Sequence, residues 1–203
     1  VVGLYGDDAP LQVARFVNLL QGRTPKGDDF PSLSSSSFER IEPGRLLVSG
    51  KIVGLNAVEL PDSLGGGVQY DWGGRLIGMG PLAESPRISH DRRGLLTHEI
   101  LAGGPTFGVT LGPTPDLNRD WAVFGEVLEG AQPQGLLAEI EALPYLTGRA
   151  APDSQTGAVG AAVYSFQRSI FTGLSKQLGD TRGDRGQVGR LLRRVEIVRT
   201  GLL

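Results

Sequence analysis

The sequence is most informative at SSSSFERIEPGRLLVSGKI, residues 34–52 of 203. This stretch reads as a strand, a tight Pro-Gly turn and a second strand, because proline and glycine both suit turn positions. Arg40 lies on the first strand, and three apolar residues at 46–48 open the second. The predicted hairpin therefore has one cation and an apolar run where a site for polar chemistry would carry other side chains.

Helix and strand patterns flank this hairpin on both sides. Asp7, Pro10 in the first turn and Gly22 just past the end predict a helix at 7–22. Its core-facing side is expected to consist of Val13, Phe16, Val17 and Leu20. Residues 54–93 form a long region punctuated by glycine and proline. A second helix is predicted at 133–144, and short strands are predicted at 1–6, 94–101, 106–111, 121–130 and 191–203.

Composition narrows the possible functions. The formal net charge of −2 and the scattered arginines provide no electrostatic basis for binding nucleic acid. The chain has no cysteine, which excludes disulfides, a thiol nucleophile and thiolate metal sites. His98-Glu99 begins like a zinc-protease motif, but position 102 is alanine where the second histidine would stand, so no metal or other cofactor is expected. No apolar run reaches the roughly 18 residues of a membrane-spanning helix.

Several stretches occur in an order that resembles one protein family. They are LYGDDAPLQVARFVNLLQG, SFERIEPG, GGPTFGVTL followed by DLNRDWAVFGEVLEG, and the closing VEIVRTGLL. Together they resemble the cyclophilin-type peptidyl-prolyl cis-trans isomerases over about residues 2–143 and 190–203. The most specific matches are F-x-R-I-x-P-G, and WAVFGEVLEG for the family's H-V-V-F-G-x-V-x-x-G.

The resemblance implies a mainly β fold, a closed antiparallel β-barrel capped by two helices. The barrel is expected to use residues 1–143 and 188–203. Family members usually have about one more N-terminal strand than this sequence provides. Because the first residue is Val1 rather than Met, we expect a cleaved or missing N-terminal segment that carries a barrel strand, a targeting peptide or both.

Residues 144–187 form an insertion relative to the compact members of the family. The spacing of its apolar residues predicts an amphipathic helix at 161–178, which packs on its own barrel or docks on a partner. The run F-x-x-L-x-x-x-L-G-D-T-R resembles plastid-targeted cyclophilins. That resemblance implies a chloroplast location, with the thylakoid lumen as the narrower expectation, and protein partners in a multi-subunit complex, contacted through 145–187.

Prolyl isomerisation sets clear demands on a site. Amide resonance creates a barrier of roughly 18–20 kcal/mol, which a catalyst lowers by stabilising the twisted state. It must hold the proline ring in an apolar pocket and place a cationic donor near the prolyl nitrogen. In the family this donor is the arginine of F-x-R, which matches Arg40.

The rest of the family's groove is largely replaced. After the Pro-Gly turn, the family's phenylalanine becomes Arg45 and its glutamine becomes Val48. Further along, a glutamine falls on Thr106, the pocket phenylalanine on Gly108 and a tryptophan on Asp116. The candidate peptide-binding groove comprises Arg45, Leu46, Val48, Thr106, Phe107, Gly108, Leu117 and Trp121, of which Trp121 replaces the family's histidine.

Two functions follow from this pattern. The first is a cyclophilin-like protein with a degenerate isomerase site, acting as a scaffold subunit or assembly factor of a larger, photosynthetic complex. The alternative is a weak or substrate-restricted prolyl isomerase that uses Arg40. Turnover of a proline peptide by the parent and by Arg40→Ala discriminates between them.

Overall fold

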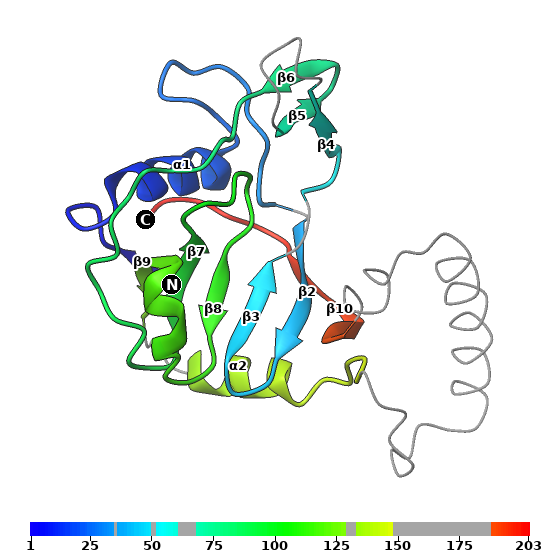
Figure 1. The fold of residues 1–203 in the computed structure, drawn as a ribbon. Helices are drawn as coiled ribbons and strands as arrows, with labels where there is room; N and C mark the ends of the chain where they lie inside the picture. The colour runs from blue at the N-terminus through cyan, green and yellow to red at the C-terminus, as the bar shows by residue number, and fades with distance from the viewer. Residues whose placement is uncertain (35, 50–51, 61–67, 129–132, 148–187) are drawn as a thin grey trace, which may run out of the picture.

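The computed structural model describes residues 1–34, 36–49, 52–60, 68–128, 133–147 and 188–203. Its main layer is a seven-stranded antiparallel sheet in the order β1-β9-β7-β8-β3-β2-β10 (Figure 1). These strands are β1 (Val2–Leu4), β2 (Ser36–Glu42), β3 (Leu46–Ser49), β7 (Leu95–Glu99), β8 (Gly108–Thr110), β9 (Trp121–Val127) and β10 (Arg190–Ile197). The described part of the chain is therefore mainly β, as predicted.

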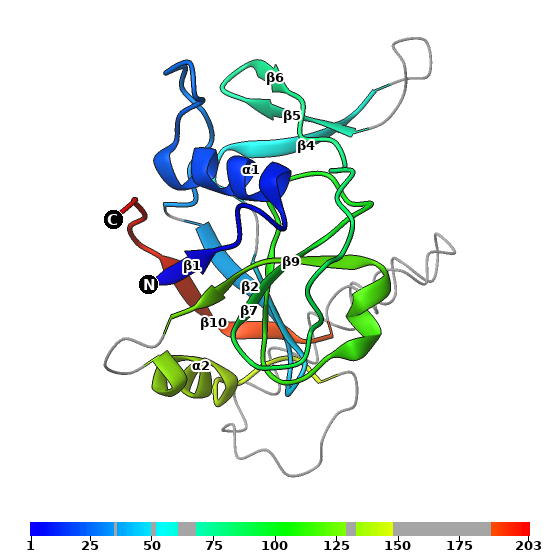
Figure 2. The same cartoon turned by 90° about the vertical axis from the view of Figure 1, so that its left-hand side faces the viewer.

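Two α-helices cover opposite ends of this sheet in the described part of the chain, α1 (Pro10–Gln21) and α2 (Pro133–Glu141), as Figures 1 and 2 show. Gly22 ends α1 in a left-handed conformation with φ +65°, which glycine adopts without strain. The predicted core-facing side of α1 is partly wrong. The helix buries Gln12, Phe16 and Leu19, while Val17 is only half-buried, and the backbone N–H of Gln12 donates to the Glu84 carboxylate.

The predicted hairpin is confirmed by β2 and β3. Their register pairs Glu42 with Leu46 and Arg40 with Val48. The backbone N–H of Arg45 donates to the carbonyl of Glu42 at 2.9 Å and closes the turn, in which Gly44 has φ +69°. Side chains two residues apart on these strands lie on the same face of the sheet, so Leu46 and Val48 share the face of Arg40.

The region between β3 and β7 contains a second sheet that the sequence reading missed. Its strands are β4 (Leu55–Glu59), β5 (Val68–Trp72) and β6 (Arg75–Ile77). Gly73 and Gly74, both with positive φ, form the two-residue turn between β5 and β6. This sheet lies beyond α1 at the end of the molecule opposite α2 (Figure 1). The segment after β6 is held against α1, because Arg15 of this helix donates to the carbonyl of Gly80 at 2.6 Å.

The main sheet has two buried faces with different contents. The inner face holds the aromatic core, made by Ile41, Leu47, Leu96, Phe107, Val109 and Phe124 together with Phe16 of α1. The outer face carries Leu46 and Leu95, which are buried but lie outside that core cluster. The segment 88–94 lies against this face, because the Thr110 hydroxyl donates to the carbonyl of Arg92 at 2.8 Å. The short 3-10 helix η2 (Pro115–Arg119) contributes a further buried leucine, Leu117.

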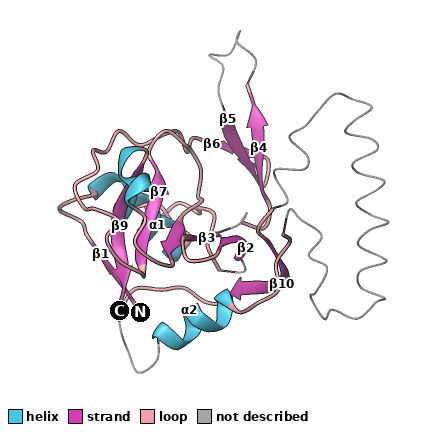
Figure 3. Ribbon diagram, turned by 60° about the horizontal axis from the view of Figure 1, so that its bottom comes forward, coloured by secondary structure: helices cyan, strands magenta, loops and turns pink. Residues whose placement is uncertain are grey.

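The predicted closure of the barrel is not observed, because no hydrogen-bonded ladder joins β1 and β10 in the described residues. Val2 of β1 and Ile197 of β10 instead line one apolar cavity of about 470 Å³ that extends into the core. Figure 3 shows both chain termini together on this side of the molecule.

Of the predicted insertion at 144–187, the structure describes residues 144–147. Its first residues pack on the sheet, because Tyr145 pairs with Leu191 and the N–H of Leu146 donates to the carbonyl of Arg190 at 2.8 Å. The predicted amphipathic helix at 161–178 lies outside the described residues. Among the helices that are described, none has the length and apolar character needed to cross a membrane.

Candidate functional site

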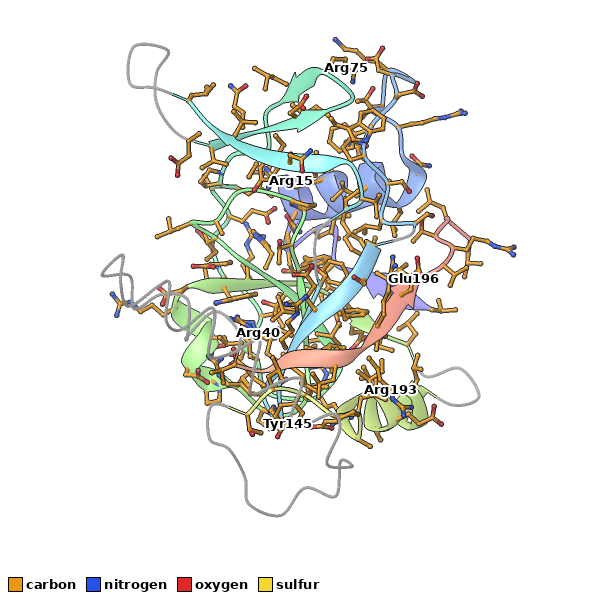
Figure 4. The ribbon with its side chains drawn as sticks, turned by 90° about the vertical axis from the view of Figure 1, so that its right-hand side faces the viewer. Arg15, Arg40, Arg75, Tyr145, Arg193 and Glu196 are labelled. Carbon is orange, nitrogen blue, oxygen red and sulfur yellow. The ribbon has the colours of Figure 1, made fainter. Side chains whose placement is uncertain are left out.

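Arg40 lies on β2 with its side chain on the outer face (Figure 4). Its side chain is 43% exposed, and its Nη2 lies 3.5 Å from the carboxylate of Glu42. Its Nε is buried and has no hydrogen-bond partner in the described residues. The aliphatic stem runs past Gly189, where an added Cβ would lie 3.0 Å from the Arg40 Cγ. The stem is thus fixed, while the guanidinium keeps donors for a ligand.

The register of the sheet brings several predicted groove residues into one row. Arg40 is paired with Val48, Val48 with Gly108, and Gly108 with Thr97. Directly paired residues point to the same side of a sheet, with side chains in contact range. The structure therefore places the cation of β2 and the replaced positions of β3 and β8 side by side on the outer face.

Leu46 fills the space above Gly108. A Cβ added to Gly108 would lie 2.7 Å from Cδ1 of Leu46, closer than non-bonded carbons approach. Leu46 is 1% exposed, so its side chain is packed in place rather than projecting into solvent. The position that the resemblance assigns to a proline-pocket phenylalanine is thus occupied by a leucine from the neighbouring strand.

An ion pair links the hairpin turn to η2 beside this leucine. Arg45 donates from Nη2 to the Asp116 carboxylate at 2.7 Å and also pairs with Glu42. These hydrogen bonds from Arg45 hold the pKa of Asp116 below its usual value. The resemblance assigns aromatic residues to both positions, so a charged bridge stands where it implies apolar walls.

His90 holds η2 against the sheet. Its backbone N–H and its Nδ1 each lie 2.8 Å from the Asn118 side-chain oxygen, and its Nε2 lies 2.8 Å from the Thr97 hydroxyl. Burial lowers the pKa of His90. In the neutral ring Nδ1–H donates to the Asn118 oxygen, while the Thr97 hydroxyl beside Nε2 also lies 3.1 Å from the carbonyl of Ala122, to which it donates. His90 therefore positions the helix that carries Asp116, a role that no sequence spacing indicated.

The remaining predicted groove residues do not all belong to this face. Phe107 points inward, where its ring lies 5.2 Å from that of Phe16 and 5.9 Å from that of Phe38. Strand alternation explains this, since Phe107 precedes Gly108 and faces the opposite side. Thr106 precedes β8 and is exposed, whereas Trp121, paired with Glu99, is half-buried on the outer face.

His98 is a buried residue of β7. It lies on the inner side, 6.2 Å from the ring of Phe124, and its Nε2 is 3.6 Å from a carboxylate oxygen of Glu84. The same carboxylate accepts the backbone N–H of Gln12 at 3.1 Å. Within the described ranges, no three His, Cys, Asp or Glu side chains gather as a metal site.

The fold and this outer-face site define a cyclophilin-like protein. The profile of the family described as cyclophilin type peptidyl-prolyl cis-trans isomerase/CLD matches residues 1–154. The chain therefore belongs to the cyclophilin-type peptidyl-prolyl cis-trans isomerase family.

Three named proteins are similar to this chain. The probable peptidyl-prolyl cis-trans isomerase A of Mycobacterium bovis and the peptidyl-prolyl cis-trans isomerase A of Mycobacterium tuberculosis are each 28% identical over 138 residues, or 63% of this chain and 67% of the relative. A crystal structure of a Cryptosporidium parvum cyclophilin type peptidyl-prolyl cis-trans isomerase, determined in the presence of the dipeptide Ala-Pro, matches with a TM-score of 0.48 and 20% identity. That match covers 71% of this chain and 79% of the other.

Proposed function

We propose that this protein is a slow, substrate-restricted peptidyl-prolyl isomerase that binds extended proline-containing segments along the outer face of β2, β3 and β8. Membership of the isomerase family supports the reaction class. The observation that carries the proposal is Arg40, whose side chain is 43% exposed on the outer face and has one ion pair, to Glu42, among the described residues.

Arg40 acts in this proposal as the donor that stabilises the twisted prolyl bond. Rotation about the bond removes the amide resonance and leaves a lone pair on the prolyl nitrogen. A guanidinium N–H directed at that nitrogen interacts more strongly with the twisted state than with the planar one, which lowers the barrier. Because the stem is fixed against Gly189, little ordering is needed to present the head.

The groove around Arg40 limits the rate and the choice of substrate. Leu46 occupies the space above Gly108, and the Arg45–Asp116 bridge borders it. A proline ring therefore lies against a filled, shallow surface rather than in a deep pocket. Weaker contact with the ring supplies less binding energy for orienting the bond, so we expect turnover well below that of an isomerase with an open pocket.

The filled pocket favours a second candidate, which is peptide binding without turnover. In this proposal the outer face docks a proline-containing segment of a partner, and the protein serves as a scaffold subunit or assembly factor. The chloroplast location implied by the resemblance belongs to this second candidate. A pull-down with and without residues 145–187 tests the partner contact, since unchanged recovery would remove those residues from it.

The first candidate is tested by isomerisation of a proline tetrapeptide. We expect measurable turnover by the parent and about a 100-fold loss in Arg40→Ala, the usual scale for removing one charge-stabilising donor. Arg199→Ala, an exposed arginine beyond β10, is the control and should retain the parent rate. Turnover that survives Arg40→Ala would overturn the role of Arg40, whereas peptide binding without any turnover would favour the scaffold.

A further inference from the structure

A second arginine stands directly opposite Arg40. Arg190, the first residue of β10, is the register partner of Arg40 on β2. The N–H of Ile41 donates to the carbonyl of Gly189 at 2.8 Å, so the two arginines form a non-hydrogen-bonded antiparallel pair. In such pairs the Cα atoms are about 4.5 Å apart and the side chains are closest. Arg190 therefore extends the groove row beyond Arg40 to the neighbouring strand.

The charges around this pair do not balance. Glu42 forms ion pairs with both Arg40 and Arg45, and Asp116 forms an ion pair with Arg45. Arg190 is exposed, and among the described residues its side chain forms no ion pair. Like charges directly opposite each other on paired strands are destabilising. Two carboxylates thus face three guanidinium groups, and the uncompensated charge lies at Arg190.

We infer that Arg190 is a second cation of the substrate groove and that it selects proline segments with an acidic residue next to the proline. The inference rests on the proposed function, because it assumes that the peptide runs past Arg40. Adjacent residues of an extended peptide are only about 3.3 Å apart along the chain, so a residue next to a proline at Arg40 lies within reach of the long, exposed Arg190 side chain. A guanidinium binds a carboxylate through two parallel hydrogen bonds.

Arg193 is a matched control on the same strand. It is exposed like Arg190 and has no ion pair within the described part of the chain. Figure 4 shows Arg193 further along β10, on the side of α2 and away from Arg40. Replacing either arginine by glutamine removes one positive charge from the same strand, so a difference between the variants reports position rather than net charge.

The test uses two peptide series in which the residue before or after the proline is Glu, Gln or Lys. For the parent we expect the Glu peptide of at least one series to have a kcat/KM roughly 1.5- to 5-fold above that of the Gln peptide, the range of an exposed ion pair. The Lys peptide should fall below both. Arg190→Gln should bring the Glu/Gln ratio close to one, and Arg193→Gln should leave it unchanged.

Binding of the same peptides, measured by fluorescence anisotropy, separates this inference from the proposed function. If the parent binds but does not turn over any peptide, the isomerase proposal fails, and the Glu/Gln ratio of Kd values tests Arg190 alone. A ratio near one for the parent in both series, or a ratio that Arg190→Gln leaves intact, would overturn the role of Arg190. Peptides that neither bind nor react would overturn both proposals.

Discussion

The inner and outer faces of the main sheet differ in how their space is filled, although the same strands make both. On β3, Leu47 turns inward into an aromatic core, while its neighbour Leu46 turns outward and covers a glycine. The inner face is apolar apart from His98, whereas the outer face combines the buried Leu46 and Leu95 with an ion pair and with His90. Because alternate side chains on a strand point to opposite faces, the core can remain intact while the site changes.

The largest expected effect lies on the inner face. Phe124→Ala removes a ring that is 0% exposed and lies 5.1 Å from that of Phe16, so we expect a loss of about 3–5 kcal/mol in the free energy of unfolding. Urea denaturation measures it. Val48→Ala, half-buried on the outer face, is the comparison and should cost about 1 kcal/mol. Equal losses in the free energy of unfolding for the two variants would show that side chains on the two faces contribute equally to stability.

The substitution Leu46→Ala on the outer face should lower stability and strengthen peptide binding. Leu46→Ala removes a buried side chain and should lower the free energy of unfolding by about 2 kcal/mol. It also opens the space above Gly108, so we expect tighter binding of a proline peptide, by several-fold in Kd. Fluorescence titration tests this. Weaker binding by a folded Leu46→Ala protein would show that Leu46 contacts the ligand rather than blocks it.

The two buried histidines make stability depend on pH. Burial lowers the pKa of His90 and of His98, although the Glu84 carboxylate raises that of His98 in part. The unfolded chain therefore takes up these protons at a higher pH than the folded protein does. Their contribution to stability is complete above pH 6.5 and is lost as the pH falls below it, by up to about 1.4 kcal/mol per pH unit for each proton.

Denaturation midpoints between pH 7.5 and 5 distinguish the two histidines. His90→Gln removes the proton taken up beside the outer face, so the loss of stability on acidification should become shallower than in the parent. The pH dependence of stability that remains in this variant then comes from His98 and the carboxylates. A slope that is unchanged in His90→Gln would show that folding leaves the pKa of His90 at its ordinary value.

The smallest expected effect concerns the bridge at the rim of the outer face. Asp116→Asn removes the partner of Arg45, but the pair is exposed and such pairs contribute little to stability. We expect no change in the denaturation midpoint beyond experimental error. Peptide binding should change by about twofold at most, as the freed Arg45 adds a cation to the groove. A large loss of stability would place this bridge among the supports of η2 beside His90.

Much of the inner face was predictable from the sequence. The Pro-Gly turn, the glycine after α1 and the alternating strands are local signals, and each led to the observed element. The three-stranded sheet at β4–β6 was missed because its strands are short and interrupted by glycine, although Gly73-Gly74 is a recognised two-residue hairpin turn. Closure of the barrel was expected from the resemblance alone, and the described strands do not close it.

The outer face was less predictable because its contacts join distant parts of the sequence. The resemblance indicated Arg40 and the replaced positions, yet it assigned Phe107 to the groove, whereas alternation turns that ring into the core. Neither the contact of Leu46 with Gly108 nor the pairing of Arg190 with Arg40 has a local signal. Such contacts depend on strand register, which the sequence leaves open on a face that is only partly buried.

The contact between Leu46 and Gly108 also makes the effects of the two positions depend on each other. An aromatic side chain at 108 would meet Leu46 at its first carbon, so Gly108→Phe alone should destabilise the protein. After Leu46→Ala, the same change should cost far less, because the space is then free. Substitutions in contact are non-additive in this way, so the order in which they arise matters. An aromatic side chain at position 108 therefore fits only after Leu46 has been replaced by a smaller residue.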